Sequence, residues 1–318
     1  MSIDGIKIFG EIVDTPVKIC YNFHISAVTC FRIYLSRENS GGMEFNMKKA
    51  INAWSFTGIT NDAREMIDLA VKAGFEGYEP AFNENGQLSL ESSDKEIAEI
   101  KKYAEDKGMP LTSLSTGLYW DYPITSNDAS IREKSSEIIK KQLNAAAVLG
   151  VDTILVVPGA VTPEVGYIEA YNRAFEGISA LADTAKSYGV VIGIENVWNK
   201  MLVSPLEMAK FIDDIGSDYV KAYFDIGNVL LFSYPEHWIR ALGKRIQKVH
   251  VKDFRTNCGN FDGFVDLLTG DVNFPAVVSA LDEIGYDGYV IAEMSEYKTH
   301  KEQLIYNTSA ALGAILGK

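Results

Sequence analysis

The 318-residue chain contains four apolar runs that each end in a side chain able to bind a metal ion. The four side chains are Glu195, Asp225, His250 and Glu293, and a helix-like stretch separates each pair. Three carboxylates and one imidazole form an oxygen-rich mixed-ligand set that suits Mn²⁺, Co²⁺ or Mg²⁺, with Zn²⁺ as a further option. We therefore predict one bound divalent metal ion, and the ligand types alone leave its identity open.

Glu195 and Glu293 are the pair that could carry proton transfer. A metal ion between two carboxylates can bind a sugar carbonyl oxygen and the neighbouring hydroxyl, and it stabilises the enediolate formed when the C–H between them is deprotonated. Each glutamate can then act as general acid or base from its own face, whereas Asp225 and His250 serve only as ligands. Returning the proton to the opposite face inverts a stereocentre, and returning it to the next carbon interconverts an aldose and a ketose.

Further polar and aromatic residues lie near predicted strand ends. Glu79 closes another strand, where it would bind a substrate hydroxyl or form a structural ion pair. Asp253, beyond His250, is expected to orient a ligand or a substrate hydroxyl. Aromatic rings at such positions either wall a pocket or pack at its rim. The candidates are Trp54, Tyr119, Trp120 and Trp198.

These side chains need a scaffold that gathers strand ends, and from residue 48 the sequence alternates strand-like and helix-like segments. The strand-like segments are continuous apolar runs, as is typical of parallel strands buried on both faces. Helix caps and glycines mark the boundaries between segments. Strands are expected at 49–54, 75–79, 111–115, 152–157, 191–195, 221–225, 247–251 and 289–293. Helices are expected at 61–73, 94–107, 129–149, 167–188, 204–215, 235–243, 274–284 and 301–316.

Eight strand–helix units predict an α/β fold, a (β/α)₈ TIM barrel, whose active site lies at the carboxyl ends of its strands. An open doubly wound sheet would not explain acidic residues at the ends of so many strands. The barrel is expected to span residues 47–318 as the catalytic domain. Residues 1–46 are expected to be a short N-terminal extension or a mis-assigned start with Met47 as the initiator, and a β-hairpin packed on the barrel is the alternative.

Composition narrows the class of partner. The net charge of −13 disfavours phosphate backbones and anionic membranes, so we expect neither nucleic-acid nor membrane binding. Three scattered cysteines are too few for a disulfide framework or a cysteine-based zinc site, which favours the reducing cytoplasm. The sequence shows neither a membrane span nor a secretory signal.

Several motifs carry a resemblance to a known family. They are GVDTILVVPG at 150–159, GIEN at 193–196, YFDIGN at 223–228, KVHVKD at 248–253, GDVNF at 270–274 and GYDGYVIAEM at 285–294. From about residue 48 to 316 the chain resembles the sugar phosphate isomerase/epimerase superfamily of xylose-isomerase-like TIM barrels. In ketose 3-epimerases of this type the matching Glu, Asp, His and Glu bind Mn²⁺ or a similar ion, and the two glutamates exchange the C3 proton. The resemblance implies these roles for Glu195, Asp225, His250 and Glu293, and a homodimer or homotetramer.

Two positions depart from the free-ketose 3-epimerases. These enzymes usually have a Glu six residues after the first metal Glu and a His three residues after the Asp, where this chain has Met201 and Asn228. The Asp-x-Gly-Asn form is more similar to that of pentulose- or hexulose-phosphate epimerases. A phosphate would need cations at the barrel mouth, for which Lys252 and Arg255 are candidates. The histidines that an endonuclease branch of the superfamily uses for a three-metal cluster are missing here.

The sequence therefore predicts an isomerase of carbohydrate metabolism, a metal-dependent sugar or sugar-phosphate 3-epimerase. One alternative is an aldose–ketose isomerase on the same site. Another is a lyase or dehydratase acting on a keto-sugar, including cleavage of 3-keto-glycosides, because an enediolate can also eject a neighbouring substituent. A barrel that only binds sugar is the non-enzymatic alternative.

Overall fold

A computed structural model describes residues 46–318, and the structural statements below concern this part of the chain. Residues 1–45 lie outside the described residues, so the expectations for the N-terminal segment stay predictions. Within the described residues no helix is both long enough and apolar enough to span a membrane. The cytoplasmic location likewise stays a prediction.

A curled sheet of seven parallel strands forms the centre of the barrel. Its strands run in the order β2-β1-β9-β6-β5-β4-β3, and all its pairs are parallel. Buried apolar side chains dominate the strands, as expected for a sheet covered on both faces. The strands are β1 (Lys48–Asn52), β2 (Gly77–Glu79), β3 (Thr153–Val156), β4 (Val191–Glu195), β5 (Val220–Asp225), β6 (Ile246–Val251) and β9 (Tyr289–Ala292).

Residues 111–115 occupy the place of the eighth strand and close the barrel between β2 and β3. We call this extended segment the eighth stave. Leu111 bridges Tyr78 in β2, and Leu114 bridges Ile154 in β3, both in parallel. The predicted strand at 111–115 is thus present as isolated bridges rather than as a regular ladder. Pro80 and Pro110 flank these pairings, and proline supplies no N–H to a ladder. The predicted (β/α)₈ barrel is confirmed, with seven regular strands and one irregular stave.

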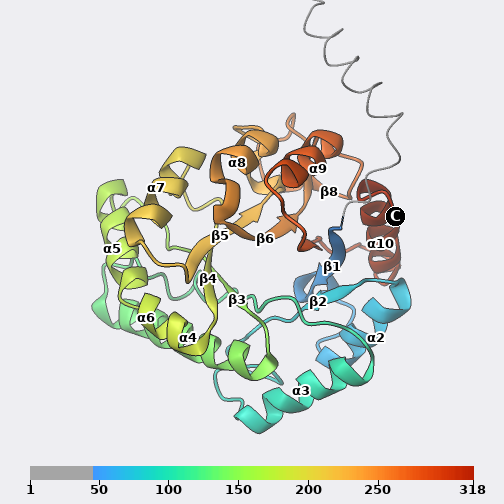
Figure 1. Cartoon of the computed structure of the whole chain (residues 1–318), viewed down its shortest axis with the longest axis horizontal. Coiled ribbons are helices and arrows are strands. Elements are labelled where there is room, and N and C mark those ends of the chain that lie inside the picture. The colour runs from blue at the N-terminus through green and yellow to red at the C-terminus, as the bar shows by residue number, and fades with distance from the viewer. Residues whose placement is uncertain (1–45) are drawn as a thin grey trace, which may run out of the picture. The chain divides into compact units, whose positions relative to one another are not determined.

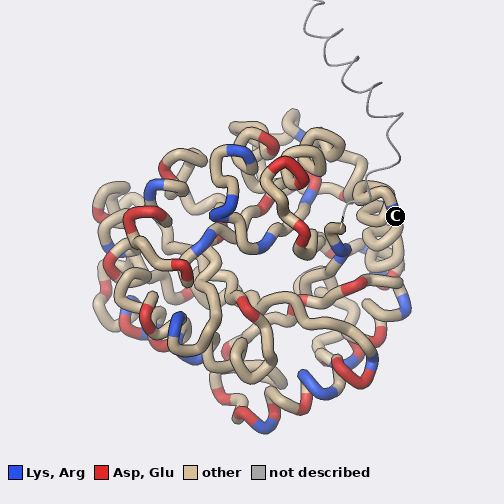
Figure 2. Tube along the Cα trace, viewed as in Figure 1, with Lys and Arg blue, Asp and Glu red and all other residues tan. Residues whose placement is uncertain are grey.

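The helices form the outer ring in Figure 1. One difference from expectation is that the helix expected at 167–188 is two helices, with a break after Gly177 and Ser179, residues of lower helix propensity than alanine. The helices are α2 (Ala63–Ala73), α3 (Asp94–Asp106), α4 (Ala129–Leu149), α5 (Tyr167–Ser179), α6 (Ala182–Tyr188), α7 (Pro205–Ile215), α8 (Pro235–Leu242), α9 (Phe274–Glu283) and α10 (Gln303–Ile315). Acidic and basic residues mingle around this ring (Figure 2).

Two strand ends depart from the expected pattern in ways that matter for the site. The strand expected at 49–54 ends at Asn52, because the Asn52 side chain accepts a hydrogen bond from the Trp54 N–H at 2.7 Å and starts a short 3₁₀ helix over Ala53–Phe56. After β6 the chain forms a small antiparallel ribbon of β7 (Asp253–Phe254) and β8 (Phe264–Val265), which lies outside the barrel sheet.

Candidate metal centre

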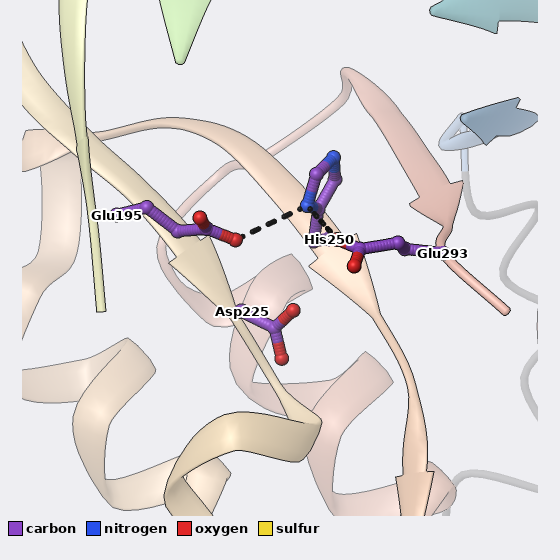
Figure 3. A group of neighbouring side chains, drawn as sticks. All are labelled: Glu195, Asp225, His250 and Glu293. Carbon is purple, nitrogen blue, oxygen red and sulfur yellow. Dashed lines mark hydrogen bonds and ion pairs between the residues drawn. The ribbon is translucent and has the colours of Figure 1, made fainter. Parts of the chain in front are cut away.

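The four predicted ligands converge at the carboxyl ends of their strands. Figure 3 shows the side chains of Glu195, Asp225, His250 and Glu293 pointing toward one another. One ligand atom from each lies within 4.8 Å of the others. That separation is about the span across a divalent ion with bonds of ~2.1–2.3 Å. Neighbouring strands β5 and β6 bring Asp225 and His250 side by side, because these two residues are partners in the sheet register.

Burying three carboxylates together has a high free-energy cost unless a cation lies beside them. Asp225 and His250 are fully buried and Glu195 is 4% exposed, while the Glu293 side chain remains 20% exposed. Buried carboxylates need positive charge or hydrogen-bond donors nearby. The only Lys or Arg that the described residues place against this cluster is Lys252, whose Nζ lies 2.5 Å from Asp225 Oδ2 and 2.9 Å from Glu293 Oε2. The donor set therefore fits a divalent cation in both chemistry and charge.

Glu79 orients the imidazole of His250. His250 Nε2 lies 2.7 Å from Glu79 Oε2, so Nε2 carries a proton that it donates to the carboxylate. Nδ1 then faces Glu195 Oε1 at 3.3 Å and Glu293 Oε2 at 3.1 Å and is the nitrogen that would bind a metal ion. A carboxylate on the far nitrogen is a common support for a metal-binding histidine. Glu79 is fully buried and does not line the cavity, so of the two predicted roles the substrate hydroxyl contact does not apply, and the structural pairing is the one with His250.

A buried polar network holds Glu79 in turn. Its carboxylate accepts hydrogen bonds from Asn52 Nδ2 at 2.5 Å, from Ser113 Oγ at 2.6 Å and from the Tyr223 hydroxyl. These residues come from β1, the eighth stave and β5, so side chains from across the barrel meet beneath the metal ligands. Sequence reasoning missed all three. Asn52 directly at a strand end was the available signal, whereas Ser113 and Tyr223 lie within strands and gave none.

Asp225 is held by two asparagines. The Asn196 side chain accepts a hydrogen bond from the Asp225 N–H at 2.9 Å and donates one to its carbonyl at 2.8 Å. Asn228 donates its backbone N–H to Asp225 Oδ1 at 2.8 Å and its side-chain amide to the Asn196 carbonyl. The asparagines in the motifs GIEN and YFDIGN thus lock the loops after β4 and β5 together.

Burial and the neighbouring charges shift the pKa values of Glu195 and Glu293 in opposite directions. Burial raises the pKa of Glu195 to about 7, against the opposing attraction of His250 and Lys252. Burial also acts to raise the pKa of Glu293, but Lys252 and His250 outweigh it and lower that pKa to about 2. Carboxyl groups with pKa values that are pushed apart can hold and accept a proton at the same pH.

Asp253 does not reach the ligands or the cavity. It lies three residues beyond His250, and both of its carboxylate oxygens accept backbone N–H groups: Oδ1 those of Phe254 and Val272, and Oδ2 that of Gly270. Contrary to expectation, Asp253 therefore contacts neither a metal ligand nor the place of a substrate hydroxyl. Asp253 instead ties the two ends of the 253–273 loop together.

A cavity of about 570 Å³ opens above the ligands. Of the substrate-binding candidates, five line it: Trp54, Trp120, Trp198, Asn228 and Lys252. Tyr119 does not, because it is buried and donates its hydroxyl to Gln142. The loop after β6 supplies lining residues that the sequence did not single out, namely Phe261, Phe264, Val265 and Asp266.

Arg255 also lies apart from the cavity lining. Its Nε donates to the carbonyl of Thr269 at 3.1 Å within the 253–273 loop. Of the two cations proposed for a phosphate, Lys252 is thus committed to Asp225 and Glu293, and Arg255 faces its own loop.

The fold is a (β/α)₈ barrel, and three carboxylates and an imidazole gather at its strand ends, the face where barrels of the enzyme class carry their active sites. Residues 67–313 match the family described as Xylose isomerase-like TIM barrel, and the chain belongs to this family.

Relatives with recorded activities are sugar epimerases. The chain is 28% identical over 248 residues to a putative L-ribulose-5-phosphate 3-epimerase of Haemophilus influenzae, covering 76% of this chain and 86% of the relative. It is 30% identical over 240 residues to D-psicose 3-epimerase of Agrobacterium fabrum, covering 71% and 77%. A crystal structure of a D-psicose 3-epimerase in the presence of D-fructose matches the fold, with a TM-score of 0.70 and 24% identity over 86% of this chain and 100% of the other. These relatives support the prediction of an isomerase-class enzyme.

Proposed function

We propose that the chain is a divalent-metal-dependent sugar 3-epimerase in which Glu195 and Glu293 exchange the proton beside a carbonyl group. The placement of the two glutamates carries this proposal. Glu195 ends β4 and Glu293 follows β9, the two outer strands of the series β4-β5-β6-β9, and both approach Nδ1 of His250, which lies between them. Two carboxylates on different sides of one site can serve two faces of a bound sugar.

Each polar residue has a distinct part in the proposal. Glu195, Asp225, His250 and Glu293 hold the metal ion, for which Mn²⁺ is our first choice among Mn²⁺, Co²⁺, Mg²⁺ and Zn²⁺. When bound, such an ion polarises the sugar carbonyl and stabilises negative charge on the enediolate. Glu195 and Glu293 take up and return the proton. Glu79 keeps His250 Nδ1 facing the site, and Lys252 holds Glu293 in place.

The relatives support this choice over other barrel chemistries. Two proteins that cover most of this chain are named for 3-epimerisation of a pentulose phosphate and of a free hexulose. Those two activities differ in substrate but share a proton exchange at the carbon next to a ketone. That shared step is what we assign to this site.

The test is hydrogen exchange at carbon. Mn²⁺-loaded protein is incubated in D₂O with ketoses, ketose phosphates and 3-keto-glycosides, and each compound is followed by NMR. We expect deuterium to enter the carbon beside the carbonyl, with an epimer as the product. A product with a moved carbonyl would identify an isomerase, and a released fragment would identify a lyase. Absence of exchange with every compound, despite bound metal, would refute the proposal.

Variants of the two glutamates sharpen the test. Glu195→Gln and Glu293→Gln should each lower exchange by about 10²–10⁴-fold, the usual contribution of a general acid or base. Glu133→Gln, on the exposed surface of α4, is the matched control and should keep the wild-type rate. Because Gln can change metal content, bound metal is measured for each variant. Near-normal turnover in either variant would remove that glutamate from the mechanism.

A further inference from the structure

The cavity above the metal ligands has an aromatic wall formed by Trp198, Phe261 and Phe264. The Trp198 ring centroid lies 5.0 Å from that of Phe261 and 5.2 Å from that of Phe264, with interplanar angles of 36° and 41°. The Trp198 N–H donates to the carbonyl of Asn228 at 2.8 Å, which fixes the indole. Rings so arranged present a broad apolar surface to the cavity.

This wall begins beside the ligand cluster and ends at the mouth. Lys252 Nζ, which contacts Glu293 at 2.9 Å, lies 6.0 Å from the Phe264 ring centroid. At the other end Phe261 is 73% exposed, although it lines the cavity. A sugar held at the ligands would therefore direct any outward substituent along the wall toward Phe261.

The charge of the lining disfavours a phosphate on that substituent. Among the lining residues within 46–318, Lys252 is the sole Lys or Arg, and it is already paired with two carboxylates. Asp266 adds negative charge to the same lining, and Glu296 there is paired with Lys301. A phosphate dianion needs several donors or cations and is repelled by carboxylates.

The cavity volume is also large for a bare sugar. About 570 Å³ lies within the range of sites that enclose drug-sized ligands. A free monosaccharide is much smaller and would leave the apolar outer part of the cavity to water. Trp54, Trp120 and Tyr297 add three more rings to the lining, so the outer part is rich in aromatic surface.

We propose that the site takes an uncharged keto sugar that carries an aromatic substituent, and that Trp198, Phe261 and Phe264 bind the aromatic group. This substrate class rests on the proposed function for its reacting end, where the ketone meets the ligand cluster. The aromatic wall is the basis for the proposed substituent at the outer end of the substrate. A sugar phosphate is the class that it argues against.

Binding is tested first, with compounds that cannot react. 4-Nitrophenyl and methyl β-glucosides share one sugar, lack a ketone, and are titrated into the Mn²⁺-loaded protein by calorimetry. We expect the aryl glucoside to bind about 10- to 100-fold more tightly, the effect of burying an aromatic ring. Equal dissociation constants for the two glucosides, or tighter binding of ribulose 5-phosphate than of the aryl glucoside, would overturn the proposal.

Variants then locate the preference. Phe261→Ala should reduce the aryl-over-methyl preference about 3- to 10-fold, the range of an aromatic pair, and Phe261→Tyr should retain it. Phe232→Ala is the control, because Phe232 is 55% exposed in the loop after β5 and does not line this cavity. A loss of preference in Phe232→Ala equal to that in Phe261→Ala would contradict the assignment.

Turnover separates this proposal from the proposed function. The 3-keto derivatives of both glucosides are compared with ribulose 5-phosphate for deuterium entry beside the ketone. Preferential exchange of the aryl compound supports both proposals. Preferential binding of the aryl glucoside without any exchange would leave the substrate class standing and refute the epimerase. Exchange that is equal for aryl and methyl compounds, or fastest for the phosphate, would refute the substrate class alone.

Discussion

Glu79 sets the geometry of the metal ligands without lining the cavity. Its carboxylate accepts a hydrogen bond from His250 Nε2–H and is itself held by Asn52, Ser113 and Tyr223. Burial acts to raise the pKa of Glu79, but the charge of His250 and the hydrogen bonds from His250, Ser113 and Tyr223 together outweigh it and lower that pKa. An ionised Glu79 increases the electron density on the imidazole and fixes which nitrogen faces the metal ion.

Glu79→Gln should weaken metal binding by about 10- to 100-fold, the usual effect of losing such a support. Gln has the same size and keeps one acceptor, so the barrel should stay folded. Competition with a fluorescent chelator measures the affinity, and circular dichroism checks the fold. Glu76→Gln, directly before β2, is the control and should bind metal like the wild type. Unchanged affinity in Glu79→Gln would show that Glu79 is only structural.

At the scale of single residues, the sequence was informative where chemistry and position coincide. Glu195, Asp225, His250 and Glu293 stand at or next to strand ends, so their convergence followed from the fold class. The part played by Glu79 did not, because it depends on which side chains meet inside the barrel. The contacts of Asp253 and Arg255 were also not predictable, since they depend on the path of the 253–273 loop.

The 253–273 loop carries Phe261 and Phe264 of the aromatic wall, and its two ends meet at Gly270. A Cβ at Gly270 would lie 2.2 Å from Asp253 Oδ1 and 2.7 Å from the Phe254 backbone nitrogen. Backbone cannot yield to such a contact as a flexible side chain can. Asp253 clamps the loop by accepting the N–H groups of Gly270 and Val272. This Asp253 clamp cannot form when residue 270 carries a side chain.

Gly270→Ala should open the Asp253 clamp and displace Phe261 and Phe264, with a destabilisation of about 1–3 kcal/mol from overpacking. Chemical denaturation measures the stability, and limited proteolysis reports cleavage within the loop. Gly259→Ala in the same loop is the control, because its Cβ would meet no atom within 4 Å. Equal behaviour of the two variants would contradict the clamp.

The N-terminal cap of helix α2 offers a test of how the outer helices are stabilised at their ends. Asp62 caps this helix by accepting the N–H groups of Arg64 and Glu65, and it also accepts a hydrogen bond from Gln87. Partial burial acts to raise the pKa of Asp62, but these hydrogen bonds outweigh it, so the pKa is lowered. A carboxyl whose folded-state pKa is lowered stabilises the fold above its unfolded pKa of about 3.9 and loses that contribution as pH falls through the folded pKa.

Asp62→Ala should therefore cost about 1 kcal/mol at neutral pH, and the difference from wild type should shrink below about pH 4. Urea denaturation at a series of pH values measures it. The exposed neighbour Asn61→Ala is the control and should have little effect. A cost that does not change with pH would mean that the Asp62 charge is not responsible.

At the scale of elements, caps and glycines located most helices within a residue or two. The exceptions have local causes. Asn52 ends β1 early by capping the 3₁₀ helix that follows, and low helix propensity breaks the segment expected at 167–188 into α5 and α6. The ribbon of β7 and β8 was missed because each strand has only two residues.

The whole barrel should be more stable with its metal ion than without it. Lys252 brings one positive charge to the carboxylates of this cluster, and a bound metal ion would offset the rest of the free-energy cost of their burial. Removing the metal with EDTA should lower the melting temperature, and adding Mn²⁺ should restore it, with a shift that grows with free metal as RT ln(1 + [M]/Kd). His250→Ala should abolish the Mn²⁺-dependent shift. A melting temperature indifferent to metal in the wild type would refute a bound ion.

The eight staves all lie within residues 46–318, so we propose residues 47–318 as the catalytic unit. Elements from both ends of this range pack together: in Figure 1 α10 lies beside β1, and Lys49 Nζ donates to Ser309 Oγ at 2.9 Å. The sequence predicted this closure from the count of strand–helix units. It did not reveal that one of the eight pairings is irregular, because the apolar pattern does not encode hydrogen-bond direction.

Because the segment 111–115 pairs irregularly, the free energy of local opening should be lower there than in the regular strands of the barrel. The N–H groups of Thr112 and Ser115 bond toward β2, whereas that of Leu114 bonds to Thr153 of β3. Since no continuous ladder joins 111–115 to either neighbour, its amide protons should exchange with solvent deuterium sooner than those of β5 and β6. Ser113 in this stave supports Glu79, so each transient opening would also release the imidazole of His250. Metal loading should therefore slow amide exchange at residues 111–115, far along the wall from β6.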